Sequence, residues 1–224
     1  MAKTTDKRTK QRLIAAASTL FAERGFHGTK ARDIAGRAAV NLAASNYHYG
    51  SKKDLYVEVL RAQFADIRDL LQRRGATRPE EELSGLSHAE LEEILEARVA
   101  AMLELLLGPP PGLHGTLMLR EMADPSEALP LIVAEFIVPM TDEFKQIVAR
   151  LAPDLSAAEV ERCVFSIIGQ ALFYRASMPA MLFMLRRKSY PRGFAQEVAA
   201  HICQFSLGGM EHLAARNRRE RVRA

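Results

Sequence analysis

The sequence is poor in the features that mark secreted, disulfide-bonded and membrane proteins. Its only two cysteines, Cys163 and Cys203, are too few for a disulfide scaffold and lack the paired spacing of a zinc site. The longest apolar stretch, residues 128–140, contains two prolines and a glutamate and is shorter than the roughly 18 to 20 residues that a membrane span requires. The first ten residues are polar and basic, with no following apolar segment of the kind found in secretory signals. We therefore expect a soluble, cytoplasmic protein with no membrane partner.

Patterns typical of enzymes and metalloproteins are missing as well. The six histidines are scattered without a His-x-x-x-His spacing, and neither a phosphate-binding glycine loop nor a Ser/His/Asp constellation is found. We predict that the chain is not an enzyme and that it uses no metal and no cofactor. A sustained alternation of apolar and polar residues is also absent, which argues against β-strands.

Charge is distributed unevenly, although the formal net charge of the 224 residues is only +4. Residues 1–64 hold 12 basic and 5 acidic side chains, a net charge of +7, whereas residues 65–215 hold 14 and 21, a net charge of −7. The last nine residues hold 5 basic side chains and 1 acidic one. A basic head on an acidic body suggests that one end of the chain meets a polyanion while the body has another task. A chance fluctuation in surface charge is the alternative.

Apolar residues recur at helical spacing along nearly the whole chain, which predicts an all-α fold. Gly25 ends the first helix as a left-handed residue, and Pro139 kinks a later one. Three serines are placed to cap helix starts: Ser51, Ser87 and Ser156. Residues 75–85 are expected to form a surface loop. The expected helices span residues 8–24, 29–38, 41–50, 52–74, 87–107, 128–151, 156–177 and 193–215, with a further segment at 113–123.

Two short helices joined by residues 38–40, preceded by a longer helix and surrounded by basic residues, match a helix-turn-helix. In that motif the second short helix enters the DNA major groove while neighbouring helices grip phosphates. Ile34 and Ala35 face the inside of the pair, and Ser45 packs back against it. Val40 fills the turn, and Thr29 or its neighbour caps the first short helix. This pattern leaves six residues facing outward: Asn41, Ala43, Ala44, Asn46, Tyr47 and His48.

These residues resemble the DNA-binding domain of the TetR family of bacterial transcriptional regulators. The resemblance covers about residues 10–57 and is carried by Thr-Lys-Ala-Arg-Asp-Ile-Ala at residues 29–35 and Val-Asn-Leu-Ala-Ala-Ser-Asn-Tyr-His-Tyr-Gly-Ser-Lys-Lys-Asp-Leu at residues 40–55. Residues 41–50 are similar to the CecR-like branch of that family. Residues 117–126 resemble the C-terminal domain of the same branch more weakly. Lys30 departs from the family, which usually has Ser or Thr there as the cap.

The resemblance implies a homodimeric, all-helical repressor that binds a palindromic double-stranded DNA operator and is released by a small-molecule effector of unknown identity. It implies a three-helix helix-turn-helix domain at residues 1–55, with the helix at 51–75 linking it to a larger effector-binding and dimerisation domain at 56–215. Residues 216–224 form a basic tail that we expect to be frayed, an auxiliary DNA contact being the alternative.

Side-chain chemistry at the matching positions suggests how DNA is contacted. Arg32 can reach guanine and Asn41 a base edge or a phosphate, while a merely solvated role stays open for both. Ala43 and Ala44 are short enough for close backbone approach and contact with thymine methyl groups. The expected phosphate clamps are Tyr47, His48 and Lys52. The predicted DNA-binding residues are therefore Lys30, Arg32, Asn41, Ala43, Ala44, Asn46, Tyr47, His48 and Lys52.

The acidic body has to hold two such motifs about 34 Å or a multiple of that apart, because one motif reads only a few base pairs. The last two long helices are apolar over wide faces, and the resemblance places a four-helix dimer interface there. Ordinary monomer core is the alternative. The predicted interface residues are Val164, Ile168, Ala171, Val198, Ile202 and Phe205.

The effector site is predicted from a methionine-rich apolar inventory and from polar residues embedded in apolar helices. Plain core packing is the alternative for each of them. The predicted effector contacts are Met118, Arg120, Phe136, Gln170 and Tyr174.

Other regulatory functions stay open at this stage. The same helices serve a transcriptional activator or a co-repressor-dependent regulator, and a DNA-binding protein of low specificity would share the basic head. Such a protein would bind DNA with a steep salt dependence and no operator. A repressor instead retains a specificity ratio above about a thousandfold at physiological salt.

Overall fold

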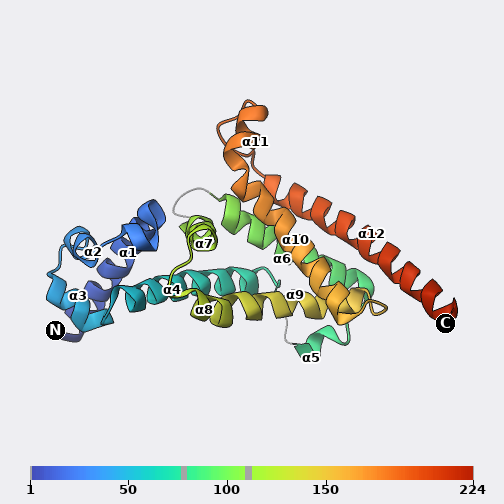
Figure 1. Ribbon diagram of the computed structural model, residues 1–224, viewed down its shortest axis with the longest axis horizontal. Helices are drawn as coiled ribbons and strands as arrows, with labels where there is room; N and C mark the ends of the chain where they lie inside the picture. The colour runs from blue at the N-terminus through green and yellow to red at the C-terminus, as the bar shows by residue number, and fades with distance from the viewer. Residues whose placement is uncertain (1, 77–79, 109–112, 224) are drawn as a thin grey trace. The chain divides into compact units, whose positions relative to one another are not determined.

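The computed structural model describes residues 2–76, 80–108 and 113–223 and confirms the all-helical fold (Figure 1). Every regular element in these ranges is helical. In chain order they are α1 (Ala2–Gly28), α2 (Ala31–Arg37), α3 (Leu42–Tyr49), α4 (Lys52–Arg73), α5 (Glu80–Leu83), α6 (His88–Leu107), α7 (Leu113–Ala123), α8 (Leu129–Ile132), the π-helical turn η1 (Val133–Ile137), α9 (Val138–Leu151), α10 (Ala157–Ala176), α11 (Met178–Met184) and α12 (Phe194–Arg223). None of these helices is both long and apolar enough to cross a bilayer.

The helices belong to two compact units, each with its own apolar core. The first unit comprises Met1–Asp66 and Pro110–Ile137, and the second comprises Ile67–Pro109 and Val138–Ala224. The boundary expected near residue 55 differs because α7, α8 and much of α4 share the core of the N-terminal helices. Leu117 and Ile132 are buried in one cluster with Phe21 and Tyr56, a partnership that helical periodicity does not reveal.

In the first unit, α1 and α4 pack around three aromatic rings. The rings of Phe21 and Tyr56 meet edge to face with centroids 4.8 Å apart, and the ring of Phe26 lies 5.1 Å from that of Tyr56. Such aromatic pairs add roughly 0.5 to 1.5 kcal/mol each beyond the burial of their surface. The face predicted for the first helix is confirmed as core, since four of its residues are at most 3 % exposed: Leu13, Ala17, Leu20 and Phe21.

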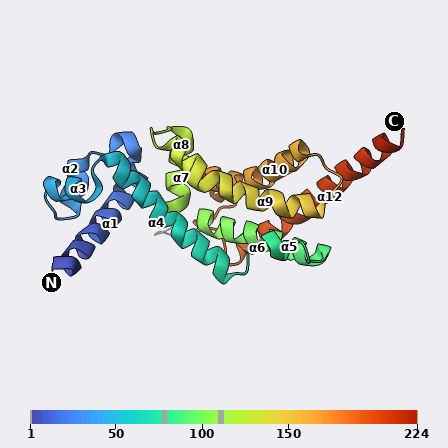
Figure 2. The same cartoon turned by 90° about the horizontal axis from the view of Figure 1, so that it is seen from below.

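In the second unit, α6, α9, α10 and α12 enclose the larger core (Figure 2). Capping boxes begin two of these helices, as the serine positions predicted. Ser87 and Glu90 form the first at the start of α6, and Ser156 and Glu159 form the second at the start of α10. Each box satisfies backbone donors that a helix start otherwise leaves free.

Several element bounds differ from the prediction. The run α1 begins at Ala2 rather than near residue 8, and Gly25 interrupts it with φ 72° and ψ 177°, so φ is positive as expected but ψ is extended. Residues 75–85 hold a short helix, α5, instead of only a loop. Before Pro139 the chain widens into η1, which accommodates the ring and the missing backbone donor of the proline.

The basic end of α12 is held by acidic partners near the start of α10. Arg216 and Asn217 donate to the carboxylate of Glu159 at 2.8 and 2.9 Å, and Arg218 donates to Asp154 at 2.5 Å. The helix continues to Arg223. The expectation of a frayed tail after residue 215 is therefore wrong, because ion pairs order a segment in which apolar periodicity has already ended.

Candidate functional site

The turn between α2 and α3 is a compact helix-turn-helix connection. The backbone N–H of Ala38 donates to the carbonyl of Ile34 at 2.9 Å, and that of Val40 donates to the carbonyl of Ala35 at 3.0 Å. Ala39 turns the chain with φ 51°, a conformation that costs an L-residue energy. The guanidinium of Arg12 on α1 donates to the Ala39 carbonyl at 2.8 Å and so braces the turn.

The start of α3 is organised by Asn41. Its Oδ1 accepts a hydrogen bond from the Ala44 backbone N–H at 2.6 Å, so Asn41 caps the helix, while its amide N–H₂ group and the second lone pair of Oδ1 stay available for DNA. Ser45 is 4 % exposed and packs inward, as predicted. Ala43, Asn46 and Tyr47 are exposed, the last with 83 % of its surface accessible.

On α2, the two predicted basic DNA contacts are open to solvent. The side chain of Arg32 is 71 % exposed and lies 3.9 Å from Asp33, and Lys30 is exposed at the position before the helix. Lys30 occupies the cap position but makes no side-chain capping bond. Thr29 does not cap α2 either, because its buried hydroxyl points back to α1, 2.7 Å from the carbonyl oxygen of Gly25.

His48 is the clearest correction to the predicted interface. Its side chain is only 7 % exposed, and Nδ1 lies 3.2 Å from Oδ1 of Asp6 on α1. The neighbouring Tyr49 hydroxyl donates to the carbonyl of Lys10, also on α1, at 3.3 Å. Because α1 extends further toward the N-terminus than its periodicity indicated, it covers the side of α3 on which His48 lies. The prediction that His48 faces outward is wrong.

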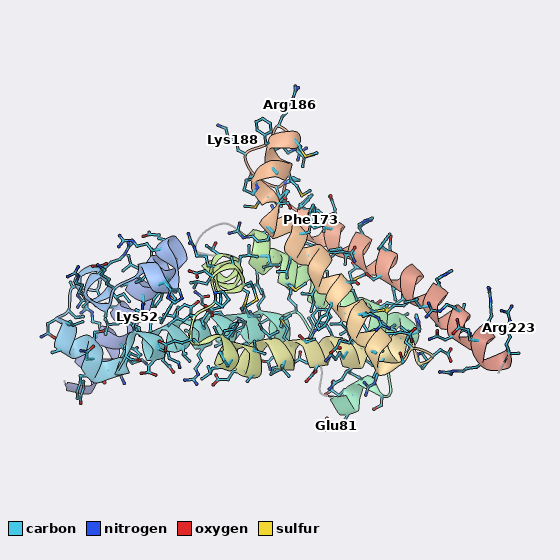
Figure 3. The ribbon with its side chains drawn as sticks, in the orientation of Figure 1. Lys52, Glu81, Phe173, Arg186, Lys188 and Arg223 are labelled. Atoms are coloured by element: carbon cyan, nitrogen blue, oxygen red, sulfur yellow. The ribbon has the colours of Figure 1, made fainter. Side chains whose placement is uncertain are left out.

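Lys52 has a structural partner as well as its predicted role. It is the first residue of α4 (Figure 3), where its Nζ donates to the carbonyl of Phe26 at 2.9 Å and lies 4.0 Å from the centroid of the Phe26 ring. An ammonium group has three N–H donors, so this contact leaves two. Ser51 caps the helix as predicted, because its Oγ accepts from the Asp54 N–H at 3.1 Å. The phosphate contact of Lys52 stays a prediction.

The predicted effector contacts are divided between the units. Met118, Arg120 and Phe136 belong to the first unit, while Gln170 and Tyr174 belong to the second. Arg120 donates to the carbonyl of Glu23 at 2.9 Å, which fastens α7 to α1. Phe136 is 6 % exposed and stacks on Phe64 with ring centroids 4.1 Å apart. Met118 packs against the same core. These three residues therefore have packing roles within the first unit.

Gln170 and Tyr174 lie on α10 in the second unit. The Gln170 amide donates to the carbonyl of Ser166 at 3.3 Å and lies 3.4 Å from the hydroxyl of Ser206 on α12. The Tyr174 ring meets that of Phe194 edge to face at 5.9 Å. Both side chains join α10 to α12, and their effector contacts stay predictions.

A surface groove of about 640 Å³ lies elsewhere in the second unit, along α12 and the connection between α9 and α10. Asp154 and Arg218, which pair with each other, are among its lining residues. None of the five predicted effector contacts lines it. Within the described ranges, no group of three side chains is arranged to hold a metal ion.

Most of the predicted dimer-interface residues belong to the core of the second unit. Val164, Ala171 and Ile202 are 0 % exposed and Val198 is 7 % exposed, so the prediction that they form a surface between subunits is wrong. Ile168 is partly buried against that core. Phe205 alone among the six is largely exposed, at 68 %. The two helices are apolar on more than one face, and the buried residues of the set lie on the faces that pack within the unit.

A different face of α10 and α12 is apolar and open. Phe165 and Phe173 on α10 are 54 % and 57 % exposed, and Phe205 on the neighbouring α12 is 68 % exposed (Figure 3 labels Phe173). Gly169 lies between the first two in sequence, and apart from the backbone of its own helix and its chain neighbours no described atom lies within 4 Å of where its Cβ would be. The exposed rings and the glycine form what we call the Phe165–Phe205 face: Phe165, Gly169, Phe173 and Phe205.

One buried charged residue was missed by sequence reasoning. Arg98 on α6 is 3 % exposed; its Nη1 donates to the carbonyl of Ala76 at 2.9 Å, and its Nη2 forms an ion pair with Glu143. Burial lowers the pKa of Arg98 to about 10. The available signal was its spacing, since it falls in the apolar stripe of α6 between Leu95 and Met102.

Two family models match the chain. Residues 13–59 match the model of the bacterial regulatory proteins of the tetR family, and residues 91–210 match that of the C-terminal domain of the HTH-type transcriptional dual regulator CecR. CecR of Shigella flexneri is 26 % identical over 181 residues, which cover 77 % of this chain and 78 % of that protein.

Two further proteins extend the comparison. The HTH-type transcriptional repressor KstR2 of Mycobacterium tuberculosis is 36 % identical over 86 residues, or 37 % of this chain and 42 % of that one. The crystal structure of the transcriptional regulator FadR of Bacillus subtilis in complex with stearoyl-CoA superposes with a TM-score of 0.61 at 14 % identity, over 89 % of this chain and 98 % of FadR. That likeness concerns the fold.

Proposed function

Because the chain belongs to the TetR family of bacterial regulatory proteins and carries a CecR-type C-terminal domain, we propose that it is a ligand-responsive transcriptional repressor. As a member of that family it is a DNA-binding transcription regulator and not an enzyme. The proposed repressor binds a palindromic operator as a homodimer, and a small molecule bound in the second unit releases it. The observation that carries the proposal is the open outer face of α3, next to a braced turn.

DNA recognition is assigned to residues with different chemistry. Ala43 is short and exposed, which permits close approach of the α3 backbone to base edges, and Asn46 offers an amide that both donates and accepts. The exposed hydroxyl of Tyr47 suits a phosphate oxygen. Arg32 on α2 has a side chain that is 71 % exposed and can extend to the N7 and O6 atoms of guanine. Asn41 contributes chiefly through its amide N–H₂ group, because its oxygen already accepts the capping hydrogen bond of α3.

Dimerisation is assigned to the Phe165–Phe205 face. Exposed rings on two neighbouring long helices are costly to leave in water, since burial of a large apolar side chain contributes about 1.5 to 3 kcal/mol. Gly169 permits the close approach of a second helix. Two copies joined through α10 and α12 would present two helix-turn-helix motifs to the two halves of a palindrome, which are about 34 Å or a multiple of that apart.

Effector binding is assigned to the second unit, which holds most of the matched CecR-type domain. FadR, which shares the fold, was solved with stearoyl-CoA, so helical bodies of this architecture hold small molecules. Gln170 and Tyr174 remain candidate contacts in this unit.

The test is selection of operator DNA from the genome. Purified protein is mixed with genomic fragments, the retained fragments are sequenced, and binding to the recovered site is measured by fluorescence anisotropy at physiological salt. A shared palindrome bound at least about a thousandfold more tightly than scrambled DNA supports the repressor. Retention of fragments without a shared sequence, with a steep salt dependence, would instead identify a DNA-binding protein of low specificity.

The curated relative CecR is named a dual regulator, which favours activation at some promoters as the second candidate function. Transcripts of the genes beside each recovered site distinguish the two when the regulator is deleted. Transcripts that rise on deletion indicate repression, and transcripts that fall indicate activation.

A further inference from the structure

Arg98 lies in the core of the second unit, where a charged side chain is expensive. It is 3 % exposed, and two residues near it on α6, Leu95 and Val99, are 0 % exposed. Burying a cation without full compensation costs several kcal/mol. An apolar residue would pack at least as well at this position. The guanidinium therefore points to a role in function and not in stability.

The donors of Arg98 are incompletely used. Nη1 donates to the carbonyl of Ala76 and Nη2 is in close ion-pair contact with Glu143, but Nε makes no hydrogen bond to any described residue. Nε and Nη2 form one edge of the planar guanidinium. Two parallel donors on such an edge match the two oxygens of a carboxylate, which is the geometry of bidentate recognition.

Glu143, the group beside that edge, is replaceable. Its side chain is 39 % exposed, whereas that of Arg98 is 3 % exposed, so the carboxylate can turn to water while the guanidinium cannot. A carboxylate from solution that took both donors would keep Nη2 paired in place of Glu143 and add the hydrogen bond that Nε lacks. Glu143 then acts as an internal competitor, which pairs with the guanidinium when no ligand is bound.

The surroundings of Arg98 favour a ligand with an apolar body. The guanidinium carbon lies 5.4 Å from the centroid of the Phe144 ring, which stabilises the cation and is itself apolar. Met102, one turn along α6, and Met140, one turn before Phe144 on α9, are partly buried against the same core. Methionine side chains are flexible and can repack around a ligand.

We propose that the second unit binds an amphipathic carboxylate, whose head pairs with the Nε and Nη2 edge of Arg98 in place of Glu143 and whose apolar part lies against Met102, Met140 and Phe144. This inference rests on the proposed function, because it names the chemical class of the effector. The ligand would also be linked to the end of α4. Arg98, which would hold the ligand, donates a hydrogen bond to the carbonyl of Ala76, in the segment that follows α4.

Chemical rescue tests the binding step. In Glu143→Ala the guanidinium loses its partner, so the melting temperature falls, and sodium octanoate restores it. We expect octanoate to bind this variant about tenfold or more tightly than wild type by calorimetry, because the internal competitor is gone. Octanol, which has the same chain and no charge, should show no such preference. Asp142→Ala is the matched control, since Asp142 is exposed on the same helix and pairs with Lys145 instead.

A second variant removes the proposed anchor. Arg98→Met replaces the charge with an apolar chain of similar length, a change that buried ion pairs often tolerate, and circular dichroism checks its fold. We expect it to lose the preference for octanoate over octanol. The proposal is overturned if octanoate binds Glu143→Ala no better than wild type, or if Arg98→Met keeps the carboxylate preference.

Operator binding measured in the same titrations separates this inference from the proposed function. Octanoate that binds through Arg98 and lowers operator affinity supports both. Octanoate that binds through Arg98 and leaves operator affinity unchanged supports the carboxylate site and contradicts ligand-induced release. Release by octanoate that persists in Arg98→Met supports a ligand-responsive regulator and overturns the site.

Discussion

The hydroxyl of Tyr56 donates a hydrogen bond of 2.8 Å to Oε2 of Glu121, and both side chains are at most 2 % exposed. Burial, together with this hydrogen bond, raises the pKa of Tyr56, so the hydroxyl keeps its proton and remains a donor. The other oxygen of Glu121 accepts from the backbone N–H and the hydroxyl of Ser126, each at 2.9 Å. One buried carboxylate thus joins α4, α7 and the chain that leads into α8.

Replacing Tyr56 with phenylalanine removes the donor and leaves a buried carboxylate oxygen without its partner. Hydrogen bonds to charged groups contribute about 1.5 to 3 kcal/mol, so we expect Tyr56→Phe to lower the free energy of unfolding by that amount. Urea denaturation measures the change. Tyr47→Phe serves as control, since Tyr47 is 83 % exposed and should lose almost nothing. Equal stabilities of the two variants would show that the buried contact does not contribute.

The turn of the helix-turn-helix offers a stabilising change. Ala39 has φ 51°, a region in which the side chain of an L-residue is crowded by the backbone and glycine is not. We expect Ala39→Gly to raise the free energy of unfolding by about 0.5 to 1 kcal/mol. Ala62→Gly, at an exposed position inside α4, should lower it by about 1 kcal/mol, because glycine is a poor helix former. Thermal unfolding should show a higher melting temperature for Ala39→Gly and a lower one for Ala62→Gly than for wild type. Destabilisation by both substitutions would refute strain at Ala39.

Acid should weaken the attachment of α12 to the start of α10. Hydrogen bonds from the Ser156 backbone and hydroxyl, and then from Asn217, lower the pKa of Glu159 from 4.5 to about 2. A lowered pKa in the folded state stabilises the protein above pH 4.5, and this contribution is lost as the pH falls toward 2. Melting temperatures across that range should therefore fall less steeply in Glu159→Gln than in wild type. Glu211→Gln, at an exposed position on α12, should keep the wild-type slope.

Two DNA-facing residues should behave differently when they are replaced. Tyr47→Ala should weaken binding to operator and to scrambled DNA alike by about tenfold, because it removes a phosphate contact. Arg32→Ala should reduce the preference for operator over scrambled DNA by about 1 to 3 kcal/mol. Fluorescence anisotropy with both DNAs measures the two effects, and Arg68→Ala, outside the helix-turn-helix, is the control. A loss of preference in Tyr47→Ala would reverse the assignment of the two roles.

Local signals in the sequence were reliable for features that depend only on interactions between residues close together in the chain. The capping serines, the positive φ of Gly25 and the buried faces of Ile34 and Ser45 all depend on neighbours within one or two turns. The spacing of two short helices indicated the helix-turn-helix, and the family resemblance agreed with it. The same local pattern places Arg32 and Tyr47 on exposed positions.

Long-range packing was the part that periodicity could not supply. His48 is exposed on an isolated α3, and only the extra length of α1 brings Asp6 against it. Val164 and Phe165 are adjacent and both apolar, yet one is 0 % and the other 54 % exposed, because α10 has apolar residues on two faces. Arg98 lies in an apolar stripe of α6, and its ion-pair partner, Glu143, is far from it in the sequence.

The Phe165–Phe205 face gives the sharpest prediction about assembly. Phe205 is 68 % exposed on α12, so aspartate in its place should leave the monomer fold intact while placing a charge in the proposed interface. Loss of a central aromatic contact worth about 2 kcal/mol raises a dimer dissociation constant about thirtyfold. Sedimentation velocity should therefore detect dimers of wild type and mostly monomers of Phe205→Asp at micromolar concentration. Phe183→Asp is the matched control, because Phe183 is 86 % exposed on α11, outside this face, and its replacement should leave the dimer unchanged. A wild-type monomer, or a Phe205→Asp dimer as tight as wild type, would remove this face from the interface.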